Sequence, residues 1–190
     1  MFSFLRAKDR PRTKISHLTT LKTENGLSSV SFNNDPHLSS NTTSIAFTLP
    51  PCLPGPNPKD NSIMIPPFHI HPRQVEYFLV TAGTALFYIN WKKIPITAGN
   101  EMIIPRGDYH KFTNASTEEP MTLEAWYDPP DLKREERFFR NLCGYLSDVA
   151  ANGTGMFTSA STPQLALFGW EADMRICEPS KFYYRCGCVC

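Results

Sequence analysis

The most informative stretch of the chain is His69-Ile70-His71-Pro72-Arg73-Gln74-Val75-Glu76. On a β-strand, residues i and i+2 point to the same face, so His69 and His71 aim at one point. Glu76 begins the next apolar run, and a neighbouring strand can bring its carboxylate to that point. Imidazole and carboxylate side chains suit iron, nickel, copper, manganese or zinc. The stretch therefore predicts a metal site built on strands.

A second block of residues follows, and Gly83 and Gly99 mark the boundary between the two blocks, with 15 residues between them. Its turn, Pro105-Arg106-Gly107, leads the chain back into the predicted sheet just before His110. A single histidine is usually a structural residue, but this one lies at a regular spacing from two others and a glutamate. The spacing favours one shared site.

The two blocks resemble the two signature motifs of the cupin superfamily. The matching positions are His69, His71, Glu76 and Gly83 in the first block, and Gly99, Pro105, Gly107, His110 and Asn114 in the second. The first motif usually opens with a glycine that serves a turn, and Ile63 stands there instead.

The resemblance implies a mainly β fold, the double-stranded β-helix or jelly-roll-type barrel, with one or two C-terminal helices packed outside. It also implies a cofactor, one divalent transition metal (Fe, Mn, Cu, Ni or Zn). The implied metal ligands are His69, His71, Glu76 and His110.

Three further strings are similar to single-domain cupins of filamentous fungi, whose members often accompany secondary-metabolite pathways. The strings are Pro66–Glu76, Trp126–Pro129 and Arg137–Leu146. This resemblance implies an enzyme that modifies a small molecule.

The rest of the chain predicts short strands followed by helices. Asn25-Gly26 predicts a hairpin over 18–32 with a type I′ turn. Regularly spaced strands separated by turn residues favour a sandwich or barrel; they are expected at 45–49, 62–66, 74–80, 84–90, 101–104, 109–113 and 121–127.

After Pro129-Pro130, apolar residues recur every three or four positions, which predicts a helix. Thr162-Pro163 predicts the start of a second helix, with threonine as the cap. The expected organisation is a basic, flexible N-terminus (1–14), a barrel (15–128), a helical segment (129–175) and a Cys-rich tail (176–190).

The amino-acid composition limits the kinds of partner that the protein is expected to bind. The chain has 190 residues, with 19 basic and 18 acidic side chains, so it lacks the basic excess typical of nucleic-acid binders. It contains no run of about 20 apolar residues that would span a membrane. Charges arrive by Arg6, before any apolar segment, so no signal peptide is expected and the predicted location is cytoplasmic. By analogy with other cupins, the hairpin at 18–32 predicts a homodimer.

Strand alternation predicts the pocket. Side chains two positions from an inward-facing ligand also face inward, and those beside His110 lie at the rim. For the strand at 121–127, the sequence does not decide between the face of Glu124 and Trp126 and the face of Leu123 and Ala125. The expected pocket residues are Phe78, Phe112, Tyr109, Arg106 and Trp126.

An apolar, aromatic interior suits a hydrophobic or aromatic substrate. The predicted function is a metal-dependent oxygenase or other oxidoreductase acting on such a metabolite. Two alternatives stay open: a non-redox isomerase, cyclase or decarboxylase that uses the metal as a Lewis acid, and a cupin that binds a ligand without chemistry.

Overall fold

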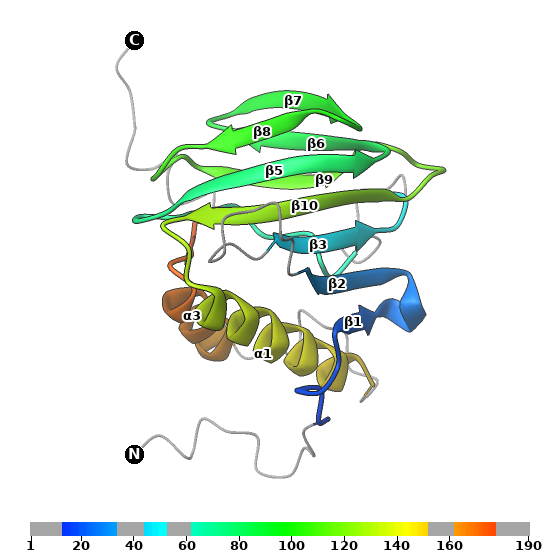
Figure 1. Ribbon diagram of the computed structural model, residues 1–190, viewed down its shortest axis with the longest axis vertical. Coiled ribbons are helices and arrows are strands. Elements are labelled where there is room, and N and C mark those ends of the chain that lie inside the picture. Colours follow the sequence, from blue (N-terminus) through cyan, green and yellow to red (C-terminus); the bar gives the residue numbers. More distant parts are fainter. Residues whose placement is uncertain (1–12, 34–43, 53–61, 152–161, 178–190) are drawn as a thin grey trace.

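The computed structural model describes residues 13–33, 44–52, 62–151 and 162–177 (Figure 1). The strands are β1 (Thr20–Thr23), β2 (Ser28–Asn33), β3 (Ser44–Leu49), β4 (His69–Ile70), β5 (Val75–Ala82), β6 (Thr84–Ile89), β7 (Lys92–Thr97), β8 (Glu101–Ile104), β9 (His110–Asn114), β10 (Met121–Asp128) and β11 (Arg175–Ile176). The helices are the 3-10 turn η2 (Glu24–Gly26), α1 (Leu132–Ala151) and α3 (Thr162–Glu171).

The strands form two antiparallel sheets. The six-stranded sheet has the order β1-β2-β3-β10-β5-β8, and the five-stranded sheet has the order β11-β4-β9-β6-β7. Their inner faces meet in an aromatic core in which the Phe78 ring lies 5.0 Å from that of Phe87 and 5.2 Å from that of Phe112. Burial of large aromatic side chains between two sheets is the main stabilisation of such a sandwich. The predicted jelly-roll-type fold is confirmed.

Gly83 turns the chain from β5 in one sheet to β6 in the other. Its φ is +73°, and a Cβ at this position would lie 2.9 Å from the Pro120 carbonyl oxygen. Backbone atoms on the neighbouring segment cannot easily move, so this turn requires glycine.

The predicted hairpin is present, with β1 paired to β2 from Thr20↔Ser31 to Thr23↔Ser28. The predicted type I′ turn is wrong, because this register leaves the four residues of 24–27 as the loop. Glu24 in that loop has a φ of +54°, and its carboxylate accepts hydrogen bonds from Ser62 Oγ (2.6 Å) and Ile63 N (2.9 Å).

Residues 62–66 do not form the predicted strand. Ile65 N donates to the Ser62 carbonyl oxygen at 3.1 Å, which makes a turn. Glu24 already binds Ile63 N, so that group is not available to a sheet ladder. Conversely, β7 was missed because it contains Pro95; it lies at the edge of its sheet, where a proline is tolerated.

The two predicted helices are present and lie together outside the sheets (Figure 1). Asp131 caps α1, since its Oδ1 accepts a hydrogen bond from Arg134 N at 3.1 Å. The segment before β1 lies against α1: Arg140 Nη1 donates to the carbonyl oxygens of Ile15 and Leu18, both at 2.8 Å. Neither α1 nor α3, the α-helices of the described ranges, has the apolar length needed to cross a membrane.

After α3 the chain returns to the five-stranded sheet. β11 pairs with β4, with Ile176 opposite His69. The helical segment is therefore tied into the sheet that carries the predicted metal ligands. The proposed 1–14 terminus and the Cys-rich tail fall mostly outside the described residues.

Candidate metal centre and cavity

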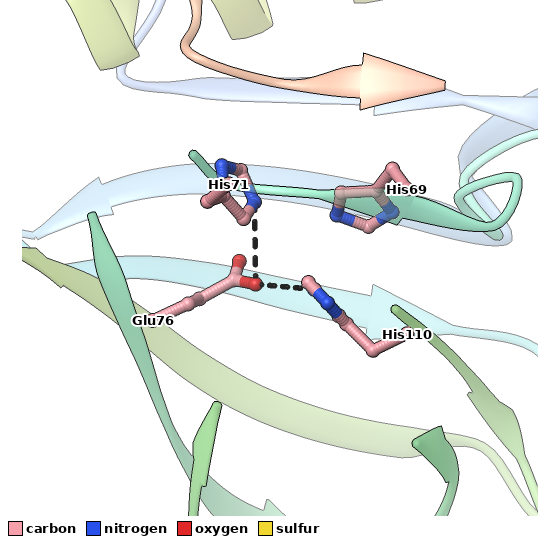
Figure 2. A group of neighbouring side chains, drawn as sticks. All are labelled: His69, His71, Glu76 and His110. Carbon is pink, nitrogen blue, oxygen red and sulfur yellow. Dashed lines mark hydrogen bonds and ion pairs between the residues drawn. The ribbon is translucent and has the colours of Figure 1, made fainter. Parts of the chain in front are cut away.

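Three strands and one loop bring the four predicted ligands together. His69 in β4 lies opposite His110 in β9, His71 follows β4, and Glu76 lies near the start of β5. None of the four residues is more than 5% exposed. One ligand atom from each lies within 4.8 Å of those of the others. Figure 2 shows the three imidazoles and the carboxylate facing a common centre.

Backbone carbonyls orient two of the imidazole rings. Nδ1 of His69 lies 2.8 Å from the Pro67 carbonyl oxygen, and Nδ1 of His110 lies 2.8 Å from that of Asp108. A carbonyl oxygen can only accept, so each Nδ1 is the donor and each Nε2 is left to face the centre. Hydrogen bonds of this kind fix the tautomer and the ring orientation of metal-ligating histidines.

Glu76 contacts the imidazoles of His110 and His71. Its Oε2 lies 2.8 Å from His110 Nε2 and 3.4 Å from His71 Nε2 (Figure 2). Because His110 Nδ1 already carries a proton, a short contact between Nε2 and a carboxylate needs a second cation between them, either a proton or a metal. This is the electrostatic setting that a divalent ion would satisfy.

Burial and the charges of neighbouring residues shift the pKa values of the clustered residues in different directions. Burial, with the charges of His110 and His71, lowers the pKa of His69 to about 3. Burial alone would lower the pKa of His110, but the hydrogen bond and charge of Glu76 raise it. Burial would raise the pKa of Glu76, yet His71 and His110 hold it well below its usual value. Burial thus acts on each of these groups, and contact with Glu76 distinguishes His110 from His69.

The ring nitrogens of His71 are not satisfied by hydrogen bonds. Among the described residues, Nδ1 has no hydrogen-bond partner and Nε2 has only the 3.4 Å contact with Glu76 Oε2, although both nitrogens are buried. A buried polar atom without a hydrogen bond costs about 1–3 kcal/mol. The donor set and the incompletely bonded His71 both fit a metal ion.

A cavity of about 340 Å³ extends from this cluster. The turn at residues 62–67 and the strand residues Phe47 and Phe112 form part of its wall. The two helices and the chain after them form another part, through Phe138, Phe139, Leu142, Leu146, Leu165, Ala172, Met174 and Ile176. The helices thus cover the metal cluster, and the sequence did not indicate this placement.

The five expected pocket residues lie in different surroundings. Phe112 lines the cavity, whereas Phe78 lies in the core between the sheets. Tyr109 stacks on Phe68 with ring centroids 4.6 Å apart, and Arg106 is exposed in its turn. Trp126 stacks on Tyr77 at 5.6 Å.

The undecided strand, β10, is now resolved. Leu123 and Ala125 are buried, and Trp126 lies on the other face. The inward face also carries Tyr127, which lines the cavity and whose ring centroid is 5.4 Å from that of His71. Burial and the neighbouring Glu76 carboxylate raise the pKa of Tyr127 well above its usual value. Alternation would have predicted Tyr127, had the inward face of this strand been known.

Glu135 is a cavity residue that the sequence analysis missed altogether. It lies in the first turn of α1, and burial raises the pKa of its carboxyl group. Its Oε1 accepts hydrogen bonds from Asp131 N and from Gln74 Nε2, both at 3.0 Å. Only the position of α1 over the cavity reveals it.

Asp173 connects the helical segment to the loop that follows His71. Its two carboxylate oxygens accept hydrogen bonds from Arg73 N and Arg73 Nε, each at 2.8 Å, and its side chain is fully buried. Gly107 N donates to the His71 carbonyl oxygen at 2.9 Å. The loop is therefore held from both sides.

Residues 63–127 match the family model of the cupin domain. The match covers both motif blocks, the four clustered residues and the strands that carry them. This region of the chain is therefore a cupin domain.

Two curated fungal proteins are similar to the chain. The "Oxidoreductase iacF" of Pestalotiopsis fici is 36% identical over 119 residues, which is 60% of this chain and 56% of that protein. The "Probable oxidoreductase virH" of Hypocrea virens is 37% identical over 92 residues, 46% of this chain and 42% of that protein. The chain thus matches about half the length of these relatives. A crystal structure of a cupin-superfamily sugar phosphate isomerase from Silicibacter pomeroyi is 17% identical, with a TM-score of 0.43, over 62% of this chain and 74% of that one.

Proposed function

We propose that the protein is a metal-dependent oxidoreductase that acts on a small hydrophobic metabolite. The observation that carries the proposal is the buried cluster of His69, His71, Glu76 and His110 at one end of an apolar cavity. These four residues would hold one divalent transition metal. The names of the two fungal relatives support the oxidoreductase class.

The residues that line the cavity suggest a separate role for each part of the site. A redox-active metal such as iron, manganese or copper would supply the electron exchange with oxygen or substrate. The carbonyl-bonded His69 and His110 keep their Nε2 atoms aimed at the centre. The apolar side chains of α1 and α3 bind the substrate and exclude water from the site.

The finer proposal concerns the pathway. Both relatives are fungal oxidoreductases by name, and a mostly apolar cavity suits an aromatic or otherwise hydrophobic molecule better than a sugar phosphate. We propose a modification step in a fungal secondary-metabolite pathway. This step would use a substrate whose carbon skeleton has already been assembled.

The first test is metal content. The protein is purified without added metal or a nickel-leaching tag, and its metals are measured by mass spectrometry. We expect about one equivalent in the native protein and none in the His69→Ala variant. His17 is exposed and remote from the cluster in the sequence, so His17→Ala is the matched control and should retain the metal. A metal-free native protein that also fails to bind added metal would contradict the proposal.

The second test is turnover. The metal-loaded protein is incubated with an extract of fungal small molecules under air, and products are followed by mass. A gain of oxygen or a loss of hydrogen, absent in His69→Ala, is the expected result. An unchanged mass would indicate an isomerase or cyclase, and loss of carbon dioxide a decarboxylase. Tight binding without conversion would indicate a binding protein.

We also propose a homodimer. Among the described strands, β1 is the outermost of the six-stranded sheet, and an edge strand can pair with a second copy. Light scattering after size-exclusion chromatography should give twice the chain mass at micromolar concentration. A clean monomer would contradict this proposal and leave the metal site untouched.

A further inference from the structure

The cavity wall contains a buried carboxylate that does not belong to the metal cluster. Glu135 is only 5% exposed, yet it lines the same cavity as His69 and His71. Burying a charged group is costly unless hydrogen bonds or a ligand compensate. The position of Glu135 therefore calls for a reason.

The structural contacts of Glu135 use only half of its carboxylate. Within the described residues, its hydrogen bonds from Asp131 N and Gln74 Nε2 both fall on Oε1. Gln74 is itself fixed, because Nε2 also donates to the Pro129 carbonyl oxygen at 2.7 Å. Helix capping and attachment to the sheet therefore use Oε1, and none of these hydrogen bonds involves Oε2.

The surroundings of Glu135 place it between the metal end and the apolar end. Its charge is one of the influences that raise the pKa of Tyr127, which lies beside Glu76 and His71. In the other direction, Phe138, Leu142 and Leu146 follow Glu135 along the same face of α1. All three line the cavity. One helix face therefore presents a hydrogen-bond acceptor followed by an apolar track.

We infer that Glu135 selects the substrate, by accepting at Oε2 a hydrogen bond from a hydroxyl group on an otherwise apolar molecule. The inference rests on the proposed function and specifies its substrate class: a compact hydroxylated or phenolic compound. Its hydroxyl group lies at Glu135, close to the metal cluster, and its apolar body lies along α1. A carboxylate acceptor rejects an isosteric molecule that lacks the donor, because the carboxylate would then be buried without a partner.

The test compares two probes on the metal-loaded protein, 2-naphthol and 2-methoxynaphthalene, which differ in the hydroxyl donor. Calorimetry should show about tenfold tighter binding of 2-naphthol, as expected for one hydrogen bond to a charged group. In Glu135→Gln the amide oxygen can still serve Asp131 N and Gln74 Nε2, while the group facing the cavity becomes a donor. This variant should fold normally and lose the preference.

The matched control is Leu142→Ala, which removes apolar wall and leaves Glu135 intact. This variant should bind both probes more weakly, by a similar factor, and keep the preference for 2-naphthol. Equal affinity of the native protein for the two probes, or no binding of either, would overturn the inference. So would an unchanged preference in Glu135→Gln, which would assign the selection to the metal. Metal content is measured separately, so failure here is distinguishable from failure of the metal site.

Discussion

The two ends of the cavity are built in different ways. The metal end consists of residues from β4, β5, β9 and the adjoining loop, all within the cupin domain, and its buried side chains are polar. The opposite end is the helical cover, α1 and α3, which presents apolar side chains and lies outside the matched domain. Strands and their loops carry the four clustered residues, whereas the added helices line the rest of the cavity. We therefore expect changes at one end to leave the other end intact.

The largest expected effect comes from removing a ligand. His110→Ala deletes the imidazole that pairs with Glu76 at 2.8 Å, and Glu76 is then left as a buried charge with a weakened partner. We expect metal content to fall at least tenfold, since outer-sphere changes alone cost about 10–100-fold in affinity. Metal analysis and circular dichroism together check that the metal is lost while the sheet remains. Retention of a full equivalent would remove His110 from the ligand set.

Shortening a side chain in the helical cover should lower the stability of the fold and leave the metal content unchanged. Leu146 is 6% exposed and lines the cavity from α1. Leu146→Ala should lower the free energy of unfolding by about 2–3 kcal/mol, near the low end for buried leucines because the cavity already exists. Denaturant unfolding measures this loss. Metal content should stay at the native level, and a parallel loss of metal would show that the two ends are not separable.

Asp173 links the helical segment to the loop that follows His71. Its buried carboxylate takes both hydrogen bonds from Arg73, two residues after His71. Asp173→Asn keeps one acceptor oxygen and loses the charge, so we expect a loss of about 1–2 kcal/mol in unfolding free energy. We also expect metal affinity to weaken by a few-fold. Competition with a chelator measures the affinity, and Arg175→Ala, on the same segment without this contact, is its control.

The smallest effect is expected where the N-terminal segment crosses α1. A Cβ at Gly144 would lie 2.9 Å from Ile15 Cδ1, which is the flexible end of a side chain. The gain of about 1 kcal/mol from replacing a helical glycine should offset the displacement of Ile15. Thermal unfolding of Gly144→Ala should therefore lie within a few degrees of the native protein. A large destabilisation would mean that Ile15 cannot move.

The sequence predicted the metal end far better than the cover. The clustered residues lie in two compact blocks of sequence, so His69, His71, Glu76 and His110 could be named from the resemblance of these blocks to the two cupin motifs. Phe112 could also be placed on the cavity wall by alternation. Tyr109 and Trp126 could not, because their positions depend on Phe68 and Tyr77, the side chains on which they stack.

The sequence predicts the two helices of the cover, but it does not predict that they pack over the cavity. Periodicity gives the apolar face of α1, whereas the surface against which that face packs is a tertiary property. β4 and β11 are two residues each and pair across more than 100 residues of sequence, so no local pattern identifies them. Glu135 was missed for the same reason: in sequence it is one of several charged residues in a first helical turn.

We propose that one metal ion lies among His69, His71, Glu76 and His110 at the end of the apolar cavity. Anomalous diffraction from crystals of the metal-loaded protein, collected on both sides of the metal's absorption edge, tests it most directly. We expect a single peak about 2.0–2.2 Å from Nε2 of His69, His71 and His110 and from a Glu76 carboxylate oxygen. A peak elsewhere in the chain, or a fully loaded protein with no peak at these residues, would contradict it.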